Sequence, residues 1–149
     1  ARRNGLEFLL EIIPSKVGPV DDETSATLIQ QFYNAGVYPD WWKLEPFKTD
    51  AAWKNAVDAI ERNDPRTRGI VVLGLDAPEE ELAASFALAA KQPLVKGFAV
   101  GRTIFGDAAR AWLQGNITDG EAVAEMAENY QRLCGIWDAA RNNALEEVA

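Results

Sequence analysis

Short apolar runs alternate with amphipathic segments along the chain. Four runs are nearly continuous in apolar residues and short, as in strands of a parallel sheet; they cover residues 6–13, 41–45, 69–75 and 95–100. Between and after them, apolar residues recur at three- and four-residue spacing, which predicts helices over residues 22–35, 51–63, 78–90, 104–113 and 119–141. Strand alternating with helix predicts βαβ units and a parallel sheet.

Several polar residues and glycines mark the ends of these helices. Gly36 is placed to stop the first helix, and Thr49 or Asp50 to cap the second. Thr118 and Glu121 have the spacing of a capping box for the last helix. The apolar stripe of that helix predicts a buried face made of Val123, Met126, Tyr130, Leu133 and Trp137.

Two α/β architectures fit this pattern, an open doubly wound sheet and part of a (β/α)8 barrel. No Gly-x-Gly-x-x-Gly follows the first strand and no P-loop motif is present, so neither dinucleotide binding nor a kinase activity has support. Four βα units within 149 residues correspond to half of a barrel. We therefore expect one domain over residues 1–149, the C-terminal half of a (β/α)8 barrel.

The chain begins at Ala1 and its only methionine is Met126, so we expect an upstream half that is not in this chain. A half-barrel would leave two apolar edges, at residues 6–13 and 95–100. We therefore expect a homo-oligomer or association with the missing half.

Composition narrows the classes of function. The net charge of −8 argues against nucleic acid or a polybasic membrane contact, and there is no apolar run of about 18 residues that could span a membrane. The absence of histidine removes His-based triads and most zinc sites, and we expect no metal and no cofactor. Cys134 is the single cysteine, so no internal disulfide can form, which favours the cytoplasm.

Charged residues on the first two predicted strands suggest the chemistry. Lys43 lies in an otherwise apolar strand that we expect to be covered on both faces, and burial lowers the pKa of an amine toward its nucleophilic form. Glu45 is two residues away on the same face, and Glu11 lies near the end of the preceding strand. Lys43 is thus a candidate for Schiff-base formation with a ketone, although Glu11 and Lys43 could also be a structural ion pair. The other lysines fall in loops, on helix surfaces or at the start of a strand: Lys16, Lys48, Lys54, Lys91 and Lys96.

A second polar group follows the third and fourth strands. It contains Gly74 and Asp76 after one strand, and Gly101, Arg102 and Thr103 after the next. Ligands of parallel α/β folds bind at the carboxyl ends of strands, so a phosphate site is expected here. Taken singly, these residues have simpler interpretations: Gly74 could be there merely to allow tight packing, and Gly101 to Thr103 could be a plain turn.

The order of these residues resembles that in the last four strands of class I Schiff-base aldolases: Glu on one strand, Lys on the next, then Gly, then Gly-Arg. Lys43-Leu44-Glu45 resembles the Lys-x-Glu strand of tagatose-bisphosphate aldolases. Nearly the whole chain, through LLEIIP, FYNAGVYPDWWKLEP, RGIVVLGLDAP and GFAVGRTIFGDAARAWL, resembles the aldolase-like domain fused to 5-dehydro-2-deoxygluconokinases of inositol breakdown, a domain of unknown function termed DUF2090.

The resemblance implies a carbon-carbon lyase that cleaves 6-phospho-5-dehydro-2-deoxygluconate into dihydroxyacetone phosphate and malonate semialdehyde. It implies that Lys43 forms the imine, that Glu11 or Glu45 moves protons, and that Arg102 with the Gly74 and Gly101 backbone holds the phosphate. Class I aldolases also take an acid/base Asp from their first strand and a Lys from their middle strands, which lie outside the matching part, so weak or no turnover is expected from this half alone. Two alternatives stay open: a sugar-phosphate isomerase or epimerase in which Lys43 and Glu11 are acid/base groups without an imine, and a non-catalytic sugar-phosphate-binding or assembly domain.

Overall fold

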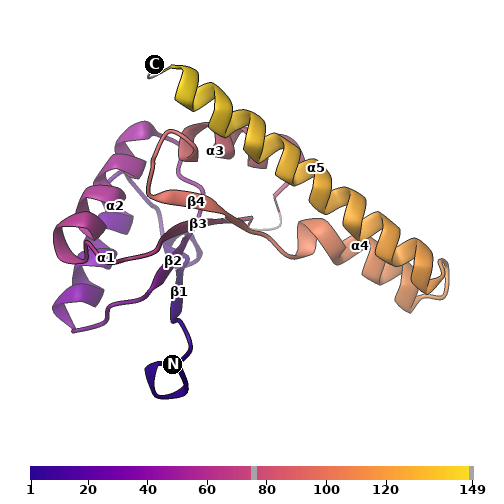
Figure 1. Cartoon of the computed structure of the whole chain (residues 1–149), viewed down its shortest axis with the longest axis horizontal. Helices are drawn as coiled ribbons and strands as arrows, with labels where there is room; N and C mark the ends of the chain where they lie inside the picture. Colours follow the sequence, from indigo (N-terminus) through magenta and orange to yellow (C-terminus); the bar gives the residue numbers. More distant parts are fainter. Residues whose placement is uncertain (75–76, 148–149) are drawn as a thin grey trace.

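The computed structural model describes residues 1–74 and 77–147, and Figure 1 shows its four strands with the helices that follow them. In chain order the elements are a 3-10 turn η1 (Arg2–Asn4), β1 (Leu9–Ile12), a 3-10 turn η2 (Pro14–Lys16), α1 (Thr24–Asn34), β2 (Trp41–Leu44), α2 (Asp50–Asn63), β3 (Gly69–Leu73), α3 (Glu79–Ala89), β4 (Val95–Ala99), α4 (Arg102–Leu113) and α5 (Asp119–Glu146).

The four strands form one parallel sheet in the order β1-β2-β3-β4. The helices form an arc around the outside of this sheet, from α1 and α2 through α3 to α5 (Figure 1). This arrangement confirms the predicted α/β class and is consistent with half of a β/α barrel. All carboxyl ends of the strands therefore meet at one rim of the sheet.

The two faces of the sheet are covered unequally. In β2, Trp42 and Leu44 are fully buried against the helices, whereas Trp41 and Lys43 on the opposite face are only half-buried. Leu9 of β1, which pairs with Trp41, keeps 44% of its surface exposed. The expectation that Lys43 sits in a strand covered on both faces was therefore wrong. The helices pack on one face of the sheet, and the opposite face, which carries Lys43, borders a pocket.

The first strand is shorter than its apolar run. Residues 6–13 were expected to form it, but β1 covers only Leu9–Ile12. Pairing with β2 begins at Leu9 opposite Trp41, and just before it the Phe8 amide donates to an Asp40 carboxylate oxygen at 2.7 Å. A side-chain acceptor thus replaces the next rung of the ladder, so the apolar pattern extends beyond the paired segment.

The helix ends follow the signals in the sequence. Thr49 caps α2 by accepting from the Ala52 amide at 3.0 Å, and Thr118 and Glu121 form the predicted capping box of α5. Gly36, with a φ of 77°, follows the end of α1 in the left-handed conformation that glycine adopts most readily.

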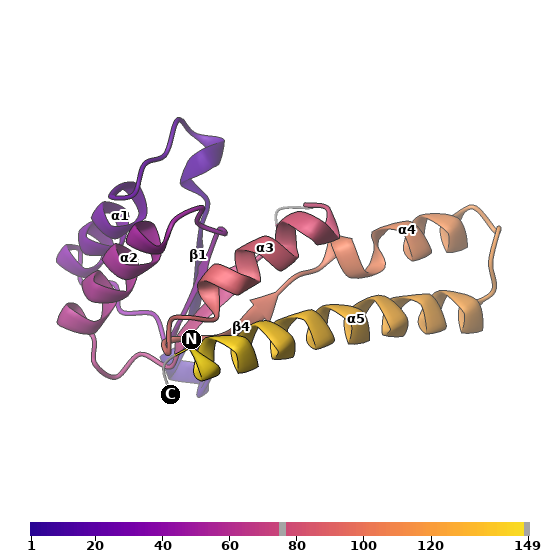
Figure 2. The same cartoon turned by 90° about the horizontal axis from the view of Figure 1, so that it is seen from above.

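The long helix α5 differs from its predicted packing. Leu133 and Trp137 are buried, but Val123 and Tyr130 keep 66% and 52% of their surface exposed. Figure 2 shows the reason: the first half of α5 lies beside α4 and projects away from the sheet, so only its second half reaches the core. Among the described helices, none is both long and apolar enough to cross a membrane.

A hydrogen-bonded aromatic pair links α1 to β2. Trp42 Nε1 donates to the Tyr33 hydroxyl at 3.0 Å, and both side chains are buried. Burial raises the pKa of Tyr33 from 10.0 to about 12, and the hydrogen bond from Trp42 opposes part of that shift. The folded protein therefore holds the Tyr33 proton more tightly than the unfolded chain does.

Replacing Tyr33 with phenylalanine is expected to destabilise the protein by about 1–3 kcal/mol at neutral pH, because the buried Trp42 indole loses its acceptor. The proton on Tyr33 contributes stability below pH 10, and this contribution is lost as pH rises through about 12. The difference in unfolding free energy between wild type and Tyr33→Phe should thus shrink over that range. Urea unfolding at pH 8 and pH 11 measures it; a difference that does not change with pH would contradict the shifted pKa.

Candidate functional site

A pocket of about 250 Å³ lies at the carboxyl ends of the strands. It brings together six of the eight residues singled out from the sequence: Glu11, Lys43, Gly74, Gly101, Arg102 and Thr103. They come from all four strand ends, because the parallel order β1-β2-β3-β4 carries each end to the same rim. Asp76 lies outside the described residues.

Lys43 and Glu11 form the charged pair of this pocket. They are direct partners in the register of β1 and β2, and Lys43 Nζ lies 3.0 Å from Glu11 Oε2. The side chains of Lys43 and Glu11 are 19% and 37% exposed, so the pair is open to the pocket. An ion pair this accessible contributes only about 0–1 kcal/mol to stability, so a stabilising role alone gives a weak account of its position.

Glu45 lies apart from this pair. It follows β2, is 5% exposed, and is absent from the residues that line the pocket. Its carboxylate instead accepts two hydrogen bonds from Ser15, from the amide at 3.2 Å and from the hydroxyl at 2.5 Å. Glu45 thus ties the segment after β1 to the end of β2.

The N-terminus of α4 forms the far end of the pocket. Gly101 is its N-cap, Arg102 is its first residue, and the buried hydroxyl of Thr103 has no hydrogen-bond partner among the described residues. The amides at the start of an α-helix point outward with a partial positive charge, which favours an anion. Together with the Arg102 guanidinium, this end of the pocket has the donors that a phosphate needs.

Gly74 permits the close approach of two strand ends. A Cβ added to Gly74 would lie 2.8 Å from a methyl carbon of Val100, which follows β4. This spacing supports the tight-packing interpretation of Gly74, while its backbone still lines the pocket. Over residues 1–74 and 77–147, no cluster of three or more acidic, Cys or His residues is placed to hold a metal ion.

The model of a family described as "Uncharacterized protein conserved in bacteria (DUF2090)" matches residues 1–141. The chain belongs to the DUF2090 family. No curated protein and no solved structure matches it. The DUF2090 membership expected from the sequence is confirmed.

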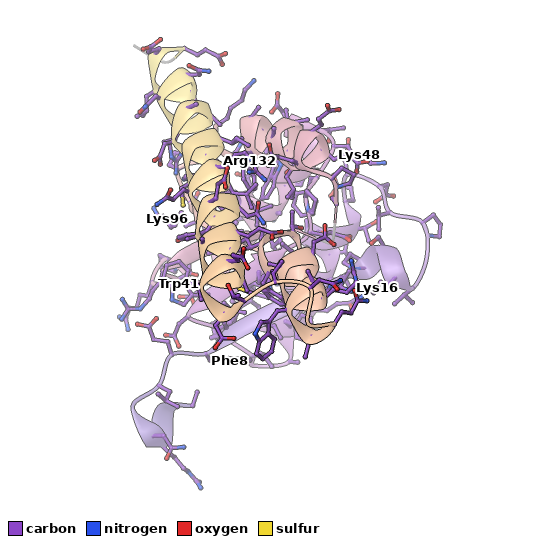
Figure 3. All side chains as sticks on the ribbon, turned by 90° about the vertical axis from the view of Figure 1, so that its right-hand side faces the viewer. Phe8, Lys16, Trp41, Lys48, Lys96 and Arg132 are labelled. Atoms are coloured by element: carbon purple, nitrogen blue, oxygen red, sulfur yellow. The ribbon has the colours of Figure 1, made fainter. Side chains whose placement is uncertain are left out.

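One residue of this DUF2090 pocket was missed. Lys16 lines the pocket from the turn η2, directly after β1, and its side chain is exposed. In Figure 3, Lys16 and Lys48, which follow the carboxyl ends of β1 and β2, lie on one side of the molecule, while Trp41 and Lys96 lie on the other. The sequence assigned Lys16 to a loop; its place four residues after the end of β1 was the signal that could have found it.

Proposed function

We propose that this chain carries the imine-forming part of a class I aldolase site. The observation that supports the proposal most is the contact between Lys43 Nζ and Glu11 Oε2 in a pocket that Arg102 also lines. An amine beside a carboxylate provides both a nucleophile and the proton acceptor that activates it.

The chemistry follows from these two groups. Glu11 takes a proton from the Lys43 ammonium, and the neutral amine adds to a substrate ketone to form a carbinolamine. Glu11 returns the proton to the carbinolamine hydroxyl, water leaves, and an iminium remains on Lys43. The iminium then accepts the electron pair of the breaking carbon-carbon bond and becomes an enamine, while a base removes the proton of the hydroxyl on the departing carbon.

The proposed substrate is 6-phospho-5-dehydro-2-deoxygluconate, and the products are dihydroxyacetone phosphate and malonate semialdehyde. The phosphate of this substrate is one carbon away from its ketone. A phosphate on Arg102 and the first amides of α4 would therefore leave the ketone within the same pocket as Lys43. The resemblance in the sequence proposes this sugar, and the pocket's charges fit it.

Borohydride trapping tests the proposal directly. Incubating the protein with dihydroxyacetone phosphate and sodium borohydride should give a stable adduct on Lys43, detected by peptide mass mapping. Trapping requires imine formation only and no turnover. A protein that binds the ketone phosphate but gives no adduct would overturn the aldolase proposal and favour acid/base chemistry without an imine, or simple binding.

We also propose that the chain self-associates through the open face of its sheet. Leu9 lies on that face with Glu11 and Lys43, and 44% of its surface is exposed. Sedimentation at low micromolar concentration should show a species heavier than the monomer, and Leu9→Lys should shift it toward the monomer. Val17→Lys is the control, because Val17 is 93% exposed in the loop after β1. A wild-type monomer across this concentration range would contradict the proposal.

A further inference from the structure

Lys16 places a positive charge in the pocket in addition to Arg102 and to Lys43, which is paired with Glu11. Lys16 enters from the end of β1 and Arg102 from the end of β4, and β1 and β4 are the outer strands of the four. Neighbouring strands lie about 4.8 Å apart, so the backbones of β1 and β4, three spacings apart, are separated by at most roughly 14 Å. The Lys43–Glu11 pair lies on the first two strands and lines the same pocket.

The position of Lys16 is set by a neighbouring, partly buried contact. Ser15 precedes it in the turn η2, and both the amide and the hydroxyl of Ser15 donate to the Glu45 carboxylate. Glu45 is 5% exposed and Ser15 is exposed, so these hydrogen bonds are partly shielded from water and hold the turn against the end of β2. Unlike Lys54 and Lys91, which pair with acidic side chains, Lys16 makes no ion pair in the described part of the chain.

The two cations suit different anions. Arg102 combines a planar guanidinium with the amides of α4, which suits the several oxygens of a phosphate. Lys16 offers a single ammonium on a flexible stem, which suits one terminal carboxylate. A substrate with a phosphate near its ketone and a carboxylate at its other end would meet both.

We propose that Lys16 is a second anion-binding residue of the pocket, positioned by Glu45 through Ser15, and that the pocket takes a sugar-acid phosphate whose carboxylate binds Lys16. The inference deepens the proposed function and rests on it for the ketone chemistry. It assigns Glu45 a positioning role: Glu45 orders the turn that carries Lys16 and does not move protons at Lys43.

Binding of ligands that cannot form an imine tests the inference independently of the aldolase step. The probes are 6-phosphogluconate, which has a carboxylate and a phosphate but no ketone, and glycerol 3-phosphate, which lacks the carboxylate. Calorimetry should show tighter binding of 6-phosphogluconate to the wild type. Lys16→Gln should weaken the binding of 6-phosphogluconate about tenfold, as expected for the loss of one charge-assisted contact, and should leave the binding of glycerol 3-phosphate unchanged. Lys48→Gln is the matched control, because Lys48 lies on the same side of the molecule but does not line the pocket.

The positioning role has its own variants. Ser15→Ala removes the hydroxyl that donates to Glu45 and should weaken the binding of 6-phosphogluconate but not of glycerol 3-phosphate. Ser15→Thr keeps a hydroxyl and should bind 6-phosphogluconate as the wild type does. Equal binding of the two probes to the wild type, or equal losses of both in Lys16→Gln, would overturn the assignment of Lys16. Failure of Ser15→Thr to restore binding would overturn the role of Glu45. The aldolase proposal is tested separately: the absence of a borohydride adduct would overturn it without affecting the assignment of Lys16.

Discussion

Lys43→Met is expected to abolish the adduct that borohydride traps with dihydroxyacetone phosphate. Methionine keeps the length of the side chain but has no amine, so no imine can form. The fold should persist, because the lost ion pair is partly exposed and Glu11, at 37% exposure, can be hydrated. The measurement is the mass of the reduced adduct, with circular dichroism to verify that the variant is folded.

Lys96→Met is the matched control for this variant. Lys96 also lies on a strand, but near the amino end of β4, where its ammonium donates to the Pro93 carbonyl at 2.8 Å. Lys96→Met should give the same yield of adduct as the wild type. An adduct that persists in Lys43→Met, or that maps to another lysine, would contradict the assignment of the nucleophile.

Arg102→Ala is expected to weaken the binding of phosphorylated ligands by about 2 kcal/mol, or about thirtyfold, through the loss of a charge-assisted contact. Dihydroxyacetone, which lacks the phosphate, should be affected little. The concentration of each ketone that gives half-maximal borohydride trapping measures both effects in one assay.

Arg110→Ala controls for the loss of a positive charge on the same helix. Arg110 lies in the last turn of α4 and pairs with Asp107 at 2.6 Å, and it does not line the pocket. Arg110→Ala should leave the trapping of dihydroxyacetone phosphate unchanged. If Arg102→Ala weakened both ketones equally, the guanidinium would act on the fold of the pocket and not on phosphate.

The meeting of most candidate residues at one rim was predictable, because they sit at strand ends. Glu11, Lys43 and Arg102 each lie within or directly after a short apolar run, and parallel strands carry such positions to one rim. The direct pairing of Glu11 with Lys43 was less certain from the sequence, since a register slip of one residue would turn Glu11 to the other face. The register depends on Ile12 and Leu10 packing under the helices, which is a tertiary effect.

The contacts of Glu45 do not follow from its spacing to Lys43. Its two-residue separation from Lys43 places both on one face, yet Glu45 follows the last paired residue of β2 and its carboxylate binds Ser15. No pattern in the sequence predicts this contact, because the two residues are 30 positions apart and meet through the path of a loop. Whether Lys16, in the turn after β1, lines the pocket also depends on the path of that loop.

The sequence by itself determined the order of strands and helices, the helix caps and the residues at the strand ends, because hydrophobic periodicity and local hydrogen bonds depend on neighbours along the chain. Only the tertiary structure decided which face of each strand is covered, why the first half of α5 leaves Val123 and Tyr130 exposed, and that Lys16 reaches the pocket. Those features depend on contacts between segments distant in sequence, whose packing no local pattern encodes.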